Sequence, residues 1–191
     1  MPGGLFWYDI GMEESILVIV KPDGMVKGLA GYVLTRFEAT GLRMVAARMA
    51  KVTRELAVAH YYHLREKPFY EELIRFIMGE FDDNQDNVLA FAFIGENAVK
   101  KARAIAGATN PEEADPTSIR GSYGRITTKG VYENVIHVSS NASEAEREIK
   151  LWFQPGEIIV DLYPTKEVIE ENKKARVWAL NEDETYGAKR T

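Results

Sequence analysis

Two uninterrupted runs of apolar residues, Ile16–Val20 and Val88–Ile94, constrain this chain more than any other feature. A strand with one face in water alternates between apolar and polar residues, and neither run alternates. Both runs are too short to cross a bilayer, which takes about 20 residues of helix. They therefore predict two strands that are buried on both faces.

The order of the remaining segments predicts the fold class. Apolar residues at helical spacing predict helices over 29–39, 53–64, from Pro68, over 97–106 and from Ser143, and the segments 42–50 and 134–139 predict two more strands. This order predicts an α/β (α+β), ferredoxin-like βαββαβ fold, an antiparallel four-stranded sheet with helices on one face. We expect an N-terminal arm at 1–12, one domain at 13–153 and a C-terminal extension at 154–191, with a helix from about Lys166 to Leu180.

The composition excludes several classes of protein. The 191 residues include no cysteine, which excludes disulfides and zinc–thiolate sites and fits a reducing compartment. The formal net charge is −5 and no basic run of five or more residues occurs, so we do not expect nucleic acid as a partner. Without a basic, then apolar, N-terminal segment, we expect no membrane association and a cytoplasmic protein.

His137 is the first candidate for chemistry, in a short predicted strand between a long loop and an acidic helix. An imidazole can act as a base, a ligand or a nucleophile, although a packed core histidine is the commoner case. Glu144 and Glu148 share a helix face that could return over it, and a carboxylate on one ring nitrogen leaves the other as the nucleophile. The alternative is a solvated face that pairs with Arg147 and Lys150.

Several cations and histidines suggest a ligand site. Lys21, Arg103 and Arg120 come from three separate segments, and converging cations can bind phosphates where the two glycine-rich nucleotide motifs are absent, as here. Each of them alone is more often a surface charge. His60 and His63 could share a helix face, but no third metal ligand follows at the usual spacing, so we expect no metal site there.

Seven motifs in one order resemble the nucleoside diphosphate kinase family. They are V-I-V-K-P-D-G at 18–24, H-Y at 60–61, K-P-F-Y at 67–70, G-A-T-N-P at 107–111, I-R-G at 119–121, N-V-I-H-V-S at 134–139 and S-E-A-E-R-E-I-K-L-W-F at 143–153. The resemblance implies ping-pong transfer of the γ-phosphoryl group from nucleoside triphosphates such as ATP to nucleoside diphosphates, which maintains the NTP and dNTP pools. It also implies Mg²⁺, carried mainly by the nucleotide phosphates.

The resemblance implies a role for each matched residue. The positions that match catalytic residues are His137, Glu148, Lys21 and Tyr61. The positions that match nucleotide-binding residues are Lys21, Phe69, Arg103, Thr109, Arg120 and Asn134. His137 falls on the phosphorylated histidine and Glu148 on the carboxylate that orients it, while Ser139 matches a nearby hydroxyl. Phe69 falls on the ring that stacks on the base and Asn134 on a sugar contact.

The chain also departs from the family. Tyr132–Glu133 stand where the family has Gly-Arg, and the region 122–133 and the acidic segment 80–87 are longer than usual. A non-catalytic nucleotide-sensing module and a phosphohistidine donor to protein partners remain alternatives. The presence of both His137 and Glu148 argues against the first, whereas the second uses the same histidine.

We expect the chain to assemble as a homo-oligomer built on a dimer. A single layer of helices covers only one face of the predicted sheet, and the apolar residues in 5–8 and 158–163 must also be buried. The family resemblance favours a hexamer.

Overall fold

The computed structural model describes residues 13–81, 86–127, 132–170 and 173–178. The expected arm at 1–12 and the end of the chain beyond 178 lie outside the described residues. Within these limits, no helix combines the length and the apolar character that a membrane span needs.

A four-stranded antiparallel sheet forms the centre of the molecule, with the order β2-β3-β1-β6. Its strands are β1 (Glu14–Val20), β2 (Arg43–Lys51), β3 (Asn87–Gly95) and β6 (Ile136–Val138). The two apolar runs of the sequence occupy β1 and β3, which pair along their length from Glu14↔Gly95 to Val20↔Leu89. Six consecutive residues of β1 are buried, which confirms the prediction of a strand covered on both faces.

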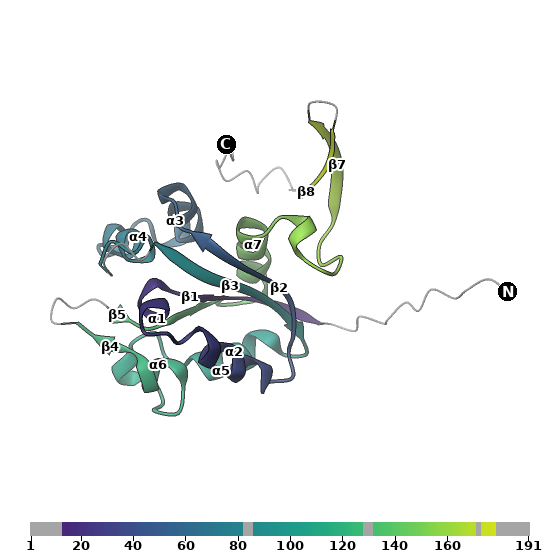
Figure 1. The fold of residues 1–191 in the computed structure, drawn as a ribbon. Coiled ribbons are helices and arrows are strands. Elements are labelled where there is room, and N and C mark those ends of the chain that lie inside the picture. Colours follow the sequence, from purple (N-terminus) through teal and green to yellow (C-terminus); the bar gives the residue numbers. More distant parts are fainter. Residues whose placement is uncertain (1–12, 82–85, 128–131, 171–172, 179–191) are drawn as a thin grey trace.

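Helices cover both faces of this sheet (Figure 1). On one face, α2 (Ala30–Glu38) and α5 (Ala98–Ala106) contribute Phe37 and Ala102 to a cluster with Ile16 and Val18 of β1. Residues of a strand point alternately to its two sides. Leu17, which lies between Ile16 and Val18, therefore points to the other face of the sheet, where it belongs to a second cluster.

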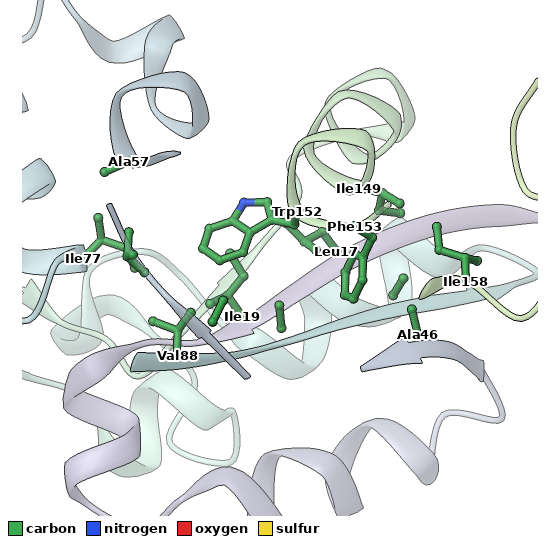
Figure 2. Packing of buried hydrophobic residues seen from close by; sticks show 14 of the residues in the cluster. Leu17, Ile19, Ala46, Ala57, Ile77, Val88, Ile149, Trp152, Phe153 and Ile158 are labelled. Carbon is green, nitrogen blue, oxygen red and sulfur yellow. The ribbon is translucent and has the colours of Figure 1, made fainter. Parts of the chain in front are cut away.

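That second cluster lies beneath three helices, α3 (Arg54–His60), α4 (Tyr70–Ile77) and α7 (Ala142–Trp152). Figure 2 shows Trp152 of α7 and Ile77 of α4 among the side chains packed with Leu17 and Ile19. The ferredoxin-like sheet is as predicted. The prediction that helices cover only one face of this sheet was wrong. Because both sides of β1 are apolar, each side needs a cover, and the chain supplies both. The bare sheet face from which we expected an oligomer therefore does not exist.

Short elements connect these layers. They are α1 (Pro22–Val26), η1 (Tyr62–Leu64), η2 (Pro111–Glu113), α6 (Ile119–Tyr123), β4 (Arg125–Ile126), β5 (Tyr132–Glu133) and η3 (Pro155–Glu157). Thr53 caps α3 as predicted, because its hydroxyl accepts a hydrogen bond from the Leu56 amide at 3.2 Å. Helix α7 begins before Ser143, since the Asn141 side chain accepts from the Glu144 amide at 2.9 Å.

The C-terminal extension contains a β-hairpin where the sequence predicted a helix. Strands β7 (Thr165–Glu170) and β8 (Lys173–Trp178) pair antiparallel. Val168 and Ile169 are β-branched and favour strands. Trp178 then fixes the end of the hairpin, because its Nε1 donates to the Phe153 carbonyl oxygen at 3.1 Å and its ring packs against Tyr163.

A substitution of Phe37 tests the packing of α2 on the face of the sheet that α2 and α5 cover. It is fully buried and stacks on Phe93 of β3 with 5.3 Å between ring centroids. We expect Phe37→Ala to lower the free energy of unfolding by about 3–5 kcal/mol, because it leaves a cavity in a closed cluster. Urea unfolding measures this loss, with the exposed Val26→Ala as the control. A loss similar to that of the control would contradict this packing.

Candidate active site

The His137 ring is oriented by a buried carboxylate. His137 lies in β6, opposite Ile19 of the central strand β1. Helix α7 starts a few residues later and brings Glu148 back over the ring, so that His137 Nε2 lies 3.0 Å from each carboxylate oxygen. The side chain of His137 is 16% exposed, whereas Glu148 is buried. Of the two glutamates singled out in the sequence, Glu148 therefore meets the histidine, and Glu144 pairs instead with Arg147 at 2.8 Å.

The Glu148 carboxylate is ionised at neutral pH. Burial alone raises its pKa, but the electrostatic interactions with the His137 and His60 rings and the hydrogen bonds from His137 and Ser139 outweigh burial and lower the pKa to about 2. The Ser139 hydroxyl donates to Glu148 Oε2 and accepts from the Leu17 amide. A carboxylate on Nε2 keeps the proton of neutral His137 there, so the lone pair lies on Nδ1.

A second histidine packs against the first. His60 is fully buried, its ring centroid lies 4.4 Å from that of His137, and its Nδ1 accepts from Trp152 Nε1 at 3.2 Å. Burial, and then the charge of His137, lower the pKa of His60 well below its usual value, so this ring is neutral. The predicted His60–His63 pair does not converge, because His63 is about half exposed and faces Glu144.

A cavity of about 610 Å³ opens over His137. Eight of the predicted site residues line it, namely Lys21, Tyr61, Phe69, Arg103, Thr109, Arg120, Asn134 and His137. The sequence analysis did not predict Tyr132, Glu72, Phe76 and Ser140, which also line the cavity. Glu148 and Ser139 lie behind the histidine. The volume is within the usual range for sites that bind small molecules.

The cations of the cavity are held rigidly. Lys21 is buried, with Nζ 4.5 Å from the centre of the Phe76 ring. Arg120 is also buried and donates to the carbonyl oxygens of Gly107 at 2.9 Å and Ile136 at 3.0 Å. Burial, and the charge of Arg103, lower the pKa of Arg120 to about 10, so it stays charged at neutral pH. Two buried cations that line one cavity favour the binding of an anion there.

A strained turn sets the direction of Asn134 and His137. Val135 has a φ of 68°, which is rare for a β-branched residue, and the Ile136 amide donates back to the Asn134 carbonyl oxygen at 2.7 Å in a γ-turn. Asp23 Oδ2 accepts from the Val135 amide at 2.8 Å. The turn thus rests on a buried carboxylate, to which the sequence analysis assigned no role beyond its place in the motif at 18–24.

Glycine allows the strained turn to approach α1. A Cβ atom on Gly24 would lie 2.8 Å from the Val135 carbonyl oxygen, closer than side-chain carbons come. The same carbonyl accepts from the Lys21 amide at 2.9 Å. Beyond the turn, Asn134 Nδ2 donates to the Thr109 carbonyl oxygen at 2.8 Å, which joins this segment to the loop after α5. The sequence signal that could have revealed the contact of Asp23 with the Val135 amide is an aspartate in the turn that follows a buried strand.

The fold and the site define a class of proteins. A ferredoxin-like sheet presents an oriented imidazole beneath a cavity lined by buried cations, which is suited to phosphorylated ligands. The family model described as nucleoside diphosphate kinase matches residues 14–158. The chain belongs to the nucleoside diphosphate kinase family and is a phosphotransferase.

Individual relatives agree with this assignment. The nucleoside diphosphate kinase of Pyrococcus furiosus is 44% identical over 145 residues, which cover 76% of this chain and 86% of the relative. That of Archaeoglobus fulgidus is 43% identical over 146 residues, 76% of this chain and 90% of the relative.

Solved structures of this family have the same fold. A transition-state mimic of the nucleoside diphosphate kinase of Borrelia burgdorferi, with bound vanadate and ADP, matches with a TM-score of 0.69 and 38% identity over 78% of this chain and 91% of that one. A halophilic nucleoside diphosphate kinase from Halobacterium salinarum in complex with CDP gives a TM-score of 0.69 and 37% identity over 78% of this chain and 92% of that one.

The lowered pKa of Glu148 predicts a pH dependence of stability. The ionised carboxylate stabilises the fold above its ordinary pKa of 4.5, and this contribution is lost as the pH falls towards its folded value of about 2. We expect the difference in unfolding free energy between the wild type and Glu148→Gln to shrink by about 2 kcal/mol from pH 5 to pH 3. Urea unfolding at both pH values measures it. The control is Glu38→Gln on an exposed position, and a difference for Glu148→Gln that does not change with pH would contradict the assignment.

The Asp23 carboxylate predicts a second stability effect. Asp23→Ala leaves the buried Val135 amide without its acceptor, so we expect a loss of about 1–3 kcal/mol in the free energy of unfolding. Asp115 is an exposed aspartate that accepts only local bonds from Thr117, and Asp115→Ala should cost about 0.5 kcal/mol. Equal losses in the two variants would show that the turn at Val135 does not depend on Asp23.

Proposed function

We propose that the chain transfers a γ-phosphoryl group from nucleoside triphosphates to nucleoside diphosphates in two half-reactions through His137. Nδ1 attacks the γ-phosphorus, the bond from this phosphorus to the β,γ-bridging oxygen breaks, and the diphosphate leaves. A second diphosphate then attacks the phosphohistidine with a terminal β-phosphate oxygen, and the imidazole regains its lone pair. The observation that carries this proposal is the Glu148 carboxylate on Nε2, which leaves Nδ1 as the nucleophile.

The remaining site residues have roles in binding and charge neutralisation. Lys21, Arg103 and Arg120 offset the charge of the phosphates, and Thr109 contacts them. Asn134 contacts the sugar and Phe69 stacks on the base. Buried Tyr61 packs edge-on to His137 and, since burial raises its pKa, it stays protonated and limits the tilt of the catalytic ring. Ser139 supports Glu148 from behind.

Magnesium fits this site as an ion carried by the nucleotide. Mg²⁺ prefers oxygen ligands and usually keeps waters and substrate phosphates in its shell. The group of possible metal ligands among the described residues, His60, His137 and Glu148, offers two nitrogens and one oxygen, so it is not an all-oxygen site. The cavity leaves room for a hydrated ion on the phosphates, where it would neutralise part of their charge.

We place the reaction in the cytoplasm, where it would keep the NTP and dNTP pools in balance. Residues 13–153 are the catalytic domain, because every site residue lies between Lys21 and Glu148, and 154–191 are an extension of it.

The chain forms a homo-oligomer built on a dimer, with a hexamer as the family's form. The support for this assembly is an exposed edge strand, since no face of the sheet is left uncovered. The edge strand β2 leaves Met44 and Met49 exposed, and edge strands with apolar side chains favour pairing.

The proposal is tested by labelling with ATP that carries a labelled γ-phosphate. We expect an acid-labile, base-stable label on the protein that passes to added GDP, and no label on His137→Asn, because that variant lacks the nucleophile. Glu148→Gln should label about 10- to 1000-fold more slowly, whereas the exposed Glu38→Gln should not change the rate.

The alternatives give different results in the same experiment. A nucleotide-sensing module would bind nucleotide without any label. A phosphohistidine donor would take up the label but keep it in the presence of GDP, and release it to a protein. Undiminished transfer in His137→Asn would overturn the proposal itself.

A further inference from the structure

Tyr132 is a cavity residue that has no role in the reaction described so far. It is 42% exposed and lines the cavity over His137. It lies in β5, where it pairs with Ile126 of β4. A large ring at the rim of a ligand site is available for contact with whatever the site holds.

Ion pairs hold the segment around Tyr132 in place. The next residue, Glu133, is buried and faces away from Tyr132, since neighbours in a strand point to opposite sides. Its carboxylate is 2.9 Å from Lys27 Nζ and 2.7 Å from Arg125 Nε. Hydrogen bonds from Arg125, and then the charge of Lys27, hold the pKa of Glu133 below its usual value in spite of burial. Asn134, the residue after Glu133, donates to the Thr109 carbonyl oxygen, so the segment that follows Tyr132 is anchored at two successive residues.

The cavity combines buried cations with exposed aromatic rings. Lys21 and Arg120 are 3% and 8% exposed, while Phe69 and Tyr132 are 50% and 42% exposed. Of the exposed phenylalanine and tyrosine side chains in the described part of the chain, these two line the cavity. The arrangement suits a ligand with a charged phosphate end and a flat, apolar end.

We propose that Tyr132 forms a second aromatic wall, so that the base of a nucleoside diphosphate lies between the rings of Phe69 and Tyr132. This inference rests on the proposed function, because it takes the phosphates to lie at the buried cations. Tyrosine suits such a wall, since it offers a large ring with only two torsions to fix. Stacking reads the flat face of a base, and a purine offers a larger face than a pyrimidine. Tyr132 thereby tunes the site towards purines.

Direct binding measurements test the second wall without depending on catalysis. We expect Tyr132→Ala to raise the calorimetric Kd for ADP and GDP about 5- to 50-fold, and that for CDP less, because a stacking ring is lost. Inorganic tripolyphosphate has no base, so its Kd should stay the same. Tyr132→Phe keeps the ring and should bind all of these ligands as the wild type does.

Two further variants serve as controls. Tyr123 is exposed to a similar degree and packs on Tyr32 outside the cavity lining, so Tyr123→Ala should leave all Kd values unchanged. Phe69→Ala removes the first aromatic wall, so it should weaken the binding of ADP but not the binding of tripolyphosphate. An unchanged melting temperature for Tyr132→Ala would establish that it is folded.

The outcomes separate this inference from the proposed function. The second wall is overturned if Tyr132→Ala binds ADP and GDP as tightly as the wild type, or if it loses tripolyphosphate binding to the same extent. The phosphohistidine mechanism is overturned by labelling of His137→Asn, whatever the Kd values are. Since calorimetry of ADP involves no transfer, either idea can fail while the other stands.

Discussion

The buried charge of Glu148 is the constraint on which the rest of the site depends. A carboxylate removed from water needs donors around it, and leaving them out costs several kcal/mol. The donors here are His137 Nε2 and the Ser139 hydroxyl, which also accepts from the Leu17 amide. One charge therefore ties α7 to the edge strand β6 and to the central strand β1. The same contacts fix the tautomer of the His137 ring, so the stability of the fold and the proposed reactivity of this ring have a common origin.

The strained turn at Val135 is the second constraint, and it explains how the floor of the cavity is built. A positive φ at a β-branched residue costs roughly 1–3 kcal/mol, which surrounding contacts must offset. The Asp23 carboxylate and the Lys21 amide hold the two sides of this peptide segment. The turn also aims the Ile136 carbonyl oxygen at the Arg120 guanidinium, which keeps a buried cation beside the histidine. The strained backbone thus positions the acceptor that holds the charged Arg120 side chain in place.

The sequence predicts those parts of the fold and site that depend on local pattern. Apolar runs were enough to place β1 and β3 in the middle of the sheet, and seven motifs in register drew together the residues that line one cavity. The second helical layer and the Asp23 contact were missed, because both depend on segments far apart in the chain. The hairpin of the extension was missed although Val168 and Ile169 favour strands, and its end is fixed by a contact with a distant residue, from Trp178 to Phe153.

Tyr132 and Glu133, which stand where the family has Gly-Arg, place a carboxylate beside the proposed phosphate site. An acidic residue beside a phosphate site repels the ligand unless its charge is met nearby. Glu133 is buried between Lys27 of the α1 C-cap and Arg125 of β4, so the three side chains together carry a net positive charge. The same contacts pin β5 and hold the Tyr132 ring at the rim of the cavity. A reversal of charge next to Asn134 is therefore compatible with phosphate binding, because the partners that neutralise it also build the aromatic side of the site.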